Sequence, residues 1–271
     1  MLQNLVLVQK NDPVCTITLN RPEKRNALCV PLLEHLVEAL QAEMDNPLTR
    51  VIVLRGAGDK IFSAGYDLDQ IPSTAQGWAE RTLSTVETAS GEDLLNMSAE
   101  CIINCHCPVV AMIYGPVIGA ACDLVVACDL RLASDTARFM IPAAKRGAIY
   151  LPQGIRRLID LVGLANAKEM LFTAAVIDAQ RAREIGLVNQ VVEAEDLEQT
   201  TYSLAGQLAL NAPLTVRGMK KIISKLLQQP ALSAKDEDEI KRLLAQCFGS
   251  SDFQEGIRAF LEKRPPEFKG R

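Results

Sequence analysis

Apolar and polar positions near the start of the chain follow first the period of a strand and then the period of a helix. Cys15, Ile17 and Leu19 fall on one face of an extended segment and the intervening threonines on the other, which is typical of a half-buried strand. Apolar side chains then recur at three- and four-residue steps until shortly before Pro47, which predicts an amphipathic helix. These helical positions are Leu33, Leu36, Val37, Leu40 and Met44. The short apolar run over 51–54 predicts a buried strand after that helix.

The alternation of strand and helix continues to about residue 193. Gly56 and Gly58 mark a turn, and the pattern then predicts a helix over 94–103, a strand over 109–114 and an apolar helix from Gly119. From about Ala194 the strand patterns cease and helical periodicity remains. The helices predicted in this part cover 197–210, 214–227, 236–247 and 253–262. We therefore expect an α/β chain whose C-terminal part is helical.

Composition narrows the class of protein. The 271 residues are 48% hydrophobic and 23% charged, which excludes disordered, collagen-like and coiled-coil chains. Because the formal net charge is −4 and no basic block is present, we do not expect a nucleic-acid partner. The longest charge-free run lies between Glu100 and Asp123, but prolines and glycines interrupt it. This run predicts a buried strand and helix, and we expect no membrane span.

The chain has eight cysteines, and whether they are expected to be oxidised or reduced indicates the cellular compartment. The chain is long and opens without a charged and apolar leader, so we expect reduced thiols and a cytoplasmic protein. Cys101, Cys105, His106 and Cys107 lie close together, yet their spacing matches no standard zinc motif, and we expect no metal site. The settings of His35 and His106 do not favour a Ser-His-Asp arrangement.

Two glycine-bearing turns are the strongest candidates for chemistry. They cover 62–68 (Phe-Ser-Ala-Gly-Tyr-Asp-Leu) and 115–123 (Gly-Pro-Val-Ile-Gly-Ala-Ala-Cys-Asp). Each places backbone N–H groups where a strand passes into a helix, and such groups stabilise negative charge that develops on a carbonyl oxygen. Taken alone, either turn also fits a purely structural role, since glycine marks turns in most α/β chains.

The setting of the two turns resembles one enzyme family along nearly the whole chain. Asn-Arg-Pro-Glu-Lys-Arg-Asn-Ala-Leu at 20–28 precedes them, and Ile-Gly-Leu-Val-Asn at 185–189 and Phe-Leu-Glu-Lys-Arg at 260–264 follow. In this order and spacing the motifs resemble the crotonase (enoyl-CoA hydratase/isomerase) superfamily. The resemblance implies a spiral core of repeated ββα units over 1–193 and a helical trimerisation region over 194–271. It also implies a homotrimer or a dimer of trimers that acts on acyl-CoA, with coenzyme A present only as part of the substrate and no separate cofactor.

The resemblance assigns roles to particular positions. The backbone N–H groups of Tyr66 and Ala120 would form an oxyanion hole around the thioester carbonyl. The coenzyme A path would be lined by Lys24, Arg25, Ala64 and Leu68, and the adenine and phosphate would be reached by Phe260 and Lys263.

Several positions depart from the hydratase pattern. Hydratases use two glutamates, and this chain has Asp123 and Ala143 in their places. Asp is shorter than Glu and alanine carries no proton, so the general acid–base step, usually worth about 10²–10⁴ in rate, would be largely lost. Ala120 stands where glycine is usual, and its Cβ would be strained if the backbone there had a positive φ.

Within the superfamily, the motifs over 62–72, 171–189 and 252–264 are most similar to the methylmalonyl-CoA decarboxylase branch. That branch has a tyrosine at the position of Tyr150, beside the substrate carboxylate, but a histidine where this chain has Tyr66. Loss of CO₂ from a malonyl-type thioester leaves an enolate that an oxyanion hole stabilises without any base. Decarboxylation is therefore the favoured chemistry, with Tyr150 orienting the departing carboxylate.

Two alternatives remain open. One is an enoyl-CoA hydratase or isomerase that uses Asp123. The other is a non-catalytic or RNA-binding relative, although RNA-binding members use a lysine-rich helix and the helix over 34–45 contains four acidic residues and no lysine.

Overall fold

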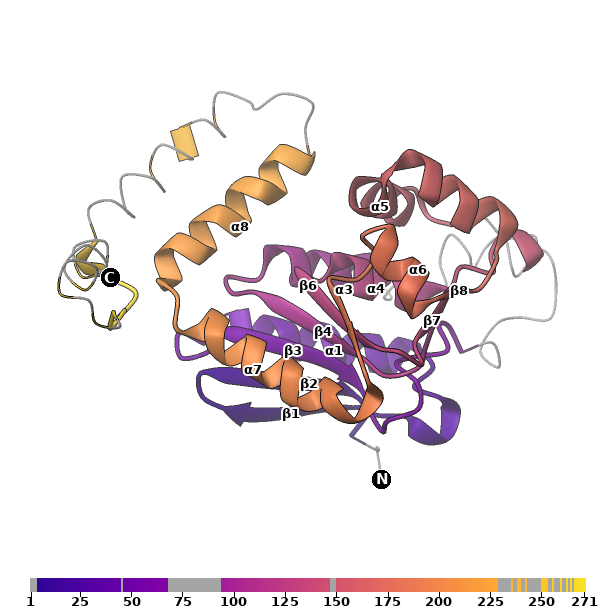
Figure 1. The fold of residues 1–271 in the computed structure, drawn as a ribbon, viewed down its shortest axis with the longest axis horizontal. Coiled ribbons are helices and arrows are strands. Elements are labelled where there is room, and N and C mark those ends of the chain that lie inside the picture. Colours follow the sequence, from indigo (N-terminus) through magenta and orange to yellow (C-terminus); the bar gives the residue numbers. More distant parts are fainter. Residues whose placement is uncertain are drawn as a thin grey trace.

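The computed structural model describes residues 4–44, 46–67, 94–146 and 150–228, and within the last part of the chain 235, 238, 239, 242, 250–252, 255, 259, 262, 264 and 266–271. The strands are β1 (Val6–Asn11), β2 (Val14–Leu19), β3 (Val51–Gly56), β4 (Val109–Ile113), β5 (Pro116–Ile118), β6 (Leu130–Ser134), β7 (Arg138–Met140), β8 (Ile177–Asp178) and β9 (Gln190–Val192) (Figure 1). The helices are α1 (Val30–Met44), α3 (Leu94–Asn104), α4 (Ala120–Ala127), α5 (Pro152–Thr173), α6 (Ala179–Glu184), α7 (Leu197–Ala209) and α8 (Pro213–Gln228).

A six-stranded sheet in the order β1-β2-β3-β4-β6-β9 forms the centre of the fold. β1 pairs antiparallel with β2, and every other neighbouring pair is parallel. The first four residues of β3 and all of β4 are continuous apolar runs that are buried on both faces. Runs of this kind are typical of parallel strands that helices cover on both sides.

A second, three-stranded sheet in the order β5-β7-β8 generates the repeat. β4 joins the large sheet, β5 joins the small sheet, and α4 follows; β6 and β7 repeat the same division before α5. These two ββα units therefore contribute one strand to each sheet, whereas β1 and β2, which precede α1, both lie in the large sheet. The short strand β5 leads directly into α4, which places the second glycine-bearing turn at the junction of the two sheets.

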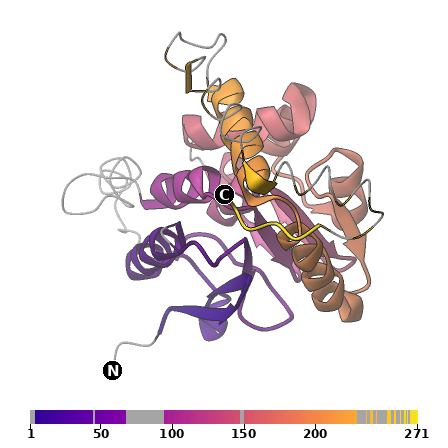
Figure 2. The same cartoon turned by 90° about the vertical axis from the view of Figure 1, so that its left-hand side faces the viewer.

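Two helical layers enclose the large sheet. Ile52 and Leu54 belong to a core shared with α1, α3 and α4, whereas Val51 and Val53 belong to a second core shared with α7. Since successive strand residues point to opposite faces, these layers lie on opposite sides of the sheet, as Figure 2 shows. The expectation of a half-buried strand over 15–19 was wrong in one respect: Thr16 is buried, and its hydroxyl hydrogen-bonds to that of Tyr202 on α7 at 2.8 Å.

The predicted architecture is confirmed: the described residues form an α/β core with ββα units, and helices follow it. Predicted elements correspond to β2, α1, β3, α3, β4, α4, α7 and α8, while the predicted helices over 236–247 and 253–262 fall largely outside the described residues. None of the described helices combines the length and the apolar character that a membrane span requires. The division at 193/194 stays a prediction, and α7, which follows it, packs on the sheet.

Candidate functional site

The first glycine-bearing turn lies between two other segments. On one side, Leu28 forms a parallel bridge with Tyr66: its N–H donates to the Gly65 carbonyl at 2.8 Å and its carbonyl accepts from Asp67 at 2.9 Å. On the other side, the Ser63 carbonyl accepts from Ile118 at 3.1 Å. In a parallel bridge of this kind the central residue directs its own N–H away from its partner. The N–H of Tyr66 therefore points to the side of β5 and the second turn.

The second turn places Ala120 at the start of α4. Gly119 has φ 58° and ψ −119°, a conformation that suits glycine, and it immediately precedes the first helical residue. The positive φ therefore falls on Gly119, and Ala120 is not among the non-glycine residues with positive φ. The backbone strain that a positive φ would cause at Ala120 is therefore absent. As the first residue of the helix, Ala120 has an N–H that the helix itself does not use.

The two turns touch one another at Gly65. This residue has φ 80°, and a methyl group there would overlap the Ile118 carbonyl oxygen and lie 3.4 Å from the backbone nitrogen of Ala120. Only glycine permits this approach of the two chains. The amides of Tyr66 and Ala120 are therefore brought to one place by segments that are far apart in the sequence.

A network of polar groups fixes the first turn to the loop over 20–28. Asn26 is fully buried, and its side-chain amide donates to the carbonyl oxygens of Ala57 at 3.0 Å and Ile61 at 3.3 Å. The Ser63 hydroxyl donates to the Asn26 carbonyl at 2.7 Å and accepts from the Gly65 N–H at 3.2 Å. Because every one of these groups is satisfied by a partner, the loop has one defined position against the turn.

Two of the positions that the resemblance assigned to coenzyme A lie on this network. The Arg25 carbonyl accepts a hydrogen bond of 3.0 Å from the Ala64 N–H, and Arg25 itself has a left-handed φ of 54°. Lys24 is exposed at the end of the short 3₁₀ helix over 22–24. The structure thus brings Lys24, Arg25 and Ala64 together. The other three assigned positions, Leu68, Phe260 and Lys263, lie outside the described residues.

An ion pair closes the same loop. The Arg21 guanidinium donates to the Asp67 carboxylate at 2.9 Å, and its other terminal nitrogen donates to the Ala27 carbonyl at 2.8 Å. Both charged side chains are nearly buried. Since Asp67 directly follows Tyr66, this pair holds the residue next to the proposed oxyanion donor.

Both oxygens of the Asp123 carboxylate bind one arginine. Asp123 lies on the first turn of α4 and is 3% exposed, and both of its oxygens accept from Arg157 on α5, at 3.0 Å from Nε and 2.9 Å from Nη2. Burial alone would lower the pKa of Arg157, but the hydrogen bonds and charge of Asp123 outweigh burial and raise it. Arg157 also donates to Asn96 at 3.0 Å. A bidentate pair of this kind takes up one lone pair on each oxygen and holds the carboxylate in one orientation toward the guanidinium.

Tyr150 lies directly beside this pair. A methyl group on Gly154 would lie 2.7 Å from the Tyr150 ring and 3.2 Å from the Asp123 carboxylate, so both side chains reach the same point on α5. The Tyr150 hydroxyl donates to the Gly119 carbonyl at 3.3 Å. Burial raises the pKa of Tyr150 well above its usual value, and the charge of Asp123 raises it further. Tyr150 is therefore a neutral hydrogen-bond donor at the second turn.

Ala143 lies in the turn that follows β7 and is in contact with the main core. Its neighbour Pro142 approaches Gly119, since a methyl group on that glycine would lie 3.7 Å from the proline ring. The position that carries the second carboxylate of a hydratase is thus near the second turn, and it carries a methyl group. The predicted pocket walls over 72–91 lie outside the described residues.

Sequence reasoning missed several residues of this site. Arg21, Asn26, Ser63 and Asp67 lie within or beside the quoted motifs, but nothing in the local pattern distinguished them from ordinary loop residues. Arg157 had no local signal, since it is one arginine on a long helix and its partner Asp123 is 34 positions away.

Comparisons with known proteins agree over almost the full length. The enoyl-CoA hydratase/isomerase family model matches residues 9–271. The chain is 33% identical to the methylmalonyl-CoA decarboxylase of Escherichia coli, covering 98% of this chain and 97% of the relative. It is 32% identical to the short-chain-enoyl-CoA hydratase of Clostridium acetobutylicum, covering 99% of both. The crystal structure of an enoyl-CoA hydratase from Bacillus anthracis has a TM-score of 0.88 at 32% identity and covers 99% of this chain and 100% of that one.

Proposed function

Because this chain belongs to the enoyl-CoA hydratase/isomerase family of acyl-CoA enzymes, we propose that it decarboxylates methylmalonyl-CoA or a closely related malonyl-type thioester. The reaction would proceed through an enolate held by the amides of Tyr66 and Ala120. The family allows several reactions on acyl-CoA, and the relatives named above include both a decarboxylase and a hydratase. The choice between them rests on the residues beside the two amides.

The proposed chemistry needs two donors and no base. The thioester carbonyl oxygen accepts hydrogen bonds from the two amides, and the bond between the α-carbon and the carboxylate breaks. Its electron pair passes to the α-carbon and the carbonyl oxygen, CO₂ leaves, and the enolate then takes one proton from water. Removal of one hydrogen-bond donor from an oxyanion hole typically costs about 2.7–4 kcal/mol of transition-state stabilisation.

The single observation that carries the proposal is the bidentate contact between Asp123 and Arg157. Hydration needs a carboxylate that positions and activates water, and this carboxylate has both oxygens on a guanidinium. Ala143 supplies no second carboxylate. Decarboxylation loses nothing from this arrangement, because the arginine neutralises a charge that would otherwise repel the carboxylate of the substrate.

The positions of the side chains around the two amides indicate further roles toward the substrate. Tyr150, neutral and next to the second turn, would orient the departing carboxylate, with Tyr66 nearby. Lys24, Arg25 and Ala64 would line the path of coenzyme A, and Leu68, Phe260 and Lys263 would complete it. Coenzyme A would enter only as part of the substrate, and the chemistry above calls on no separate cofactor.

The proposal extends to assembly and location. We expect a homotrimer or dimer of trimers, without a nucleic-acid partner. The seven cysteines in the described part of the chain are free thiols, which fits a reducing compartment such as the cytoplasm.

A panel of acyl-CoA thioesters, with products identified by mass spectrometry, tests the proposal. We expect CO₂ release from methylmalonyl-CoA or a near relative to be faster than hydration of crotonyl-CoA. Robust hydration that Asp123→Asn abolishes, with no CO₂ from any malonyl-type thioester, would establish the hydratase alternative. A protein without activity on any thioester would point to a non-catalytic relative.

A further inference from the structure

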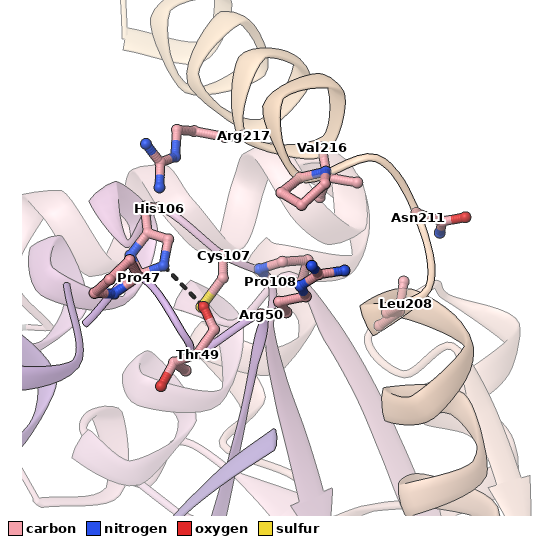
Figure 3. A pocket seen from close by; sticks show the side chains of 11 residues that line it. Pro47, Thr49, Arg50, His106, Cys107, Pro108, Leu208, Asn211, Val216 and Arg217 are labelled. Atoms are coloured by element: carbon pink, nitrogen blue, oxygen red, sulfur yellow. Dashed lines mark hydrogen bonds between the residues drawn. The ribbon is translucent and has the colours of Figure 1, made fainter. Parts of the chain in front are cut away.

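Three consecutive side chains, Cys105, His106 and Cys107, converge just before β4, at the opposite end of this strand from the second glycine-bearing turn. One ligand atom from each lies within 4.8 Å of the others. His106 and Cys107 line a small pocket whose other walls come from the loop before β3 and from α7 and α8 (Figure 3). Neither the family's chemistry nor the proposed reaction uses these residues.

The separation of the two sulfur atoms fits a shared metal ion. Cys105 Sγ and Cys107 Sγ are 3.6 Å apart, and both residues are 3% exposed. Two Zn–S bonds of about 2.3 Å at a tetrahedral angle place the sulfurs about 3.8 Å apart. The two thiols therefore have the required separation with only a slight adjustment.

The ring of His106 presents a nitrogen of the required kind. Its Nε2 lies 2.9 Å from the Thr49 carbonyl oxygen, a contact visible in Figure 3. A carbonyl only accepts, so Nε2 carries the proton, and in the neutral ring Nδ1 then offers a lone pair. Within the described part of the chain the buried Nδ1 has no nitrogen or oxygen partner, and the polar side chain next to the ring is the Cys105 thiol. A metal-binding histidine commonly has its other N–H fixed by a carbonyl in this way.

Two cationic side chains, Lys220 and Arg217, lie close to the cluster, and Arg217 lines the pocket. Lys220 is paired with Asp129 at 2.6 Å and also donates to the Cys107 carbonyl at 3.0 Å. Its positive charge is therefore largely compensated, which limits its repulsion of a bound cation.

From this geometry we propose that Cys105, His106 and Cys107 bind one Zn²⁺ ion, with a fourth coordination position open to the pocket. The spacing alone predicts that the cluster holds no metal, and the geometry leads to a different prediction. The pocket volume of about 40 Å³ accommodates a water molecule as the fourth ligand. All three ligands lie just before β4, and His106 also contacts the loop that contains Thr49, close to the point where Lys220 binds the Cys107 carbonyl.

The test uses the full-length, reduced protein. The Zn²⁺ content of the purified protein is measured by inductively coupled plasma mass spectrometry. The metal-free protein is then titrated with Zn²⁺ in competition with a chelator of known affinity. Co²⁺ replaces Zn²⁺ in a parallel titration, because thiolate ligands give it a charge-transfer absorption band. Cys105→Ser and Cys107→Ser are compared with the control Cys128→Ser, a buried cysteine whose Sγ donates to the Leu124 carbonyl at 3.3 Å, a bond that serine can keep.

We expect one Zn²⁺ per chain, a cobalt–thiolate band, and affinity about 100-fold or more lower in each of the first two variants but not in the control. Alkylation of the wild-type protein, mapped by peptide mass spectrometry, should show Cys105 and Cys107 protected by Zn²⁺, and this readout depends on no variant. Three outcomes would overturn the proposal: no uptake by the reduced protein, uptake that persists in both variants, or a Cys105–Cys107 disulfide in a protein that takes up no Zn²⁺ after reduction.

Discussion

The hydroxyl of Tyr150 donates a hydrogen bond of 3.3 Å to the carbonyl oxygen of Gly119. That carbonyl belongs to the same peptide group as the N–H of Ala120. A donor on the oxygen of a peptide polarises it and strengthens its N–H as a donor. Tyr150 is therefore connected to the proposed oxyanion hole through one amide, in addition to the role toward the substrate carboxylate that we propose for it.

Tyr150→Phe removes this hydroxyl and keeps the ring. We expect decarboxylation of the preferred thioester to slow by about 10- to 150-fold, which corresponds to about 1.5–3 kcal/mol for a hydrogen bond to a charged group. Initial rates of CO₂ release measure the effect. Tyr202→Phe is the matched control, because its hydroxyl contacts Thr16 on the far face of the sheet. Equal rates for wild type and Tyr150→Phe would remove Tyr150 from the mechanism.

Arg157→Gln should damage the protein more than Asp123→Asn. The first change leaves a buried carboxylate without its cation, which typically costs about 3–5 kcal/mol of stability. The second change leaves an arginine that still contacts Asn96 and the Glu100 carboxylate, the latter at 3.5 Å. We expect Asp123→Asn to retain most decarboxylation and Arg157→Gln to raise KM for the anionic substrate. Urea unfolding and steady-state kinetics of both variants, and of the double variant, distinguish stability from charge repulsion.

Gly119→Ala should impair catalysis, whereas Ala120→Gly should not. The backbone of Gly119 has a positive φ and a negative ψ, and a side chain in such a sparsely populated region costs about 1–3 kcal/mol. Ala120 has helical geometry, and its replacement keeps the N–H. The comparison of kcat/KM for the two variants tests whether activity depends on the backbone conformation of the turn at Gly119 or on the methyl group of Ala120. An inactive Ala120→Gly enzyme would contradict this expectation.

The outer face of α8 predicts self-association. Met219, Ile223 and Leu226 follow one another at four- and three-residue steps and are 52%, 57% and 54% exposed. A stripe of exposed apolar side chains of this kind is usually covered by a partner. We expect a mass that is a multiple of three chains by light scattering, and smaller species for Ile223→Asp. Leu48→Asp, an exposed leucine outside α8, serves as the control, and a monomeric wild type would refute the prediction.

Glu43 should make stability depend on acid pH. Its buried carboxylate accepts from Lys10 at 2.6 Å and from the Thr49 hydroxyl at 2.6 Å. Burial alone would raise its pKa, but these bonds outweigh burial and lower the pKa below the ordinary 4.5. The stabilisation is therefore complete above that value and is lost as pH falls through the folded-state pKa. Glu43→Gln should lower stability at neutral pH and flatten its decline in acid, compared with Glu38→Gln at an exposed position of the same helix.

The sequence predicted long elements and local motifs well. Helix α1 and strands β3 and β4 have a clear apolar period, and the two turns are contiguous motifs. Strands β5, β8 and β9 have three residues or fewer, which is too short for a period, and they exist because distant segments pair with them. The contact between Asp123 and Arg157 was also beyond sequence reasoning, since neither residue carries a local mark of its partner. Thr16 seemed solvent-facing because its cover, α7, comes from the other end of the chain.

The position of α7 has a consequence for synthesis of the chain. The sheet is complete once β9 has left the ribosome, but Val51, Val53, Val110 and Met112 on one of its faces meet their apolar partners only when α7 follows. Until then a nascent chain exposes a row of apolar side chains on that face, a typical site of aggregation. A fragment that ends at residue 193 would keep that row exposed permanently. Cellular quality control would therefore detect a prematurely terminated chain by its exposed sheet face, whether or not the fragment had enzymatic activity.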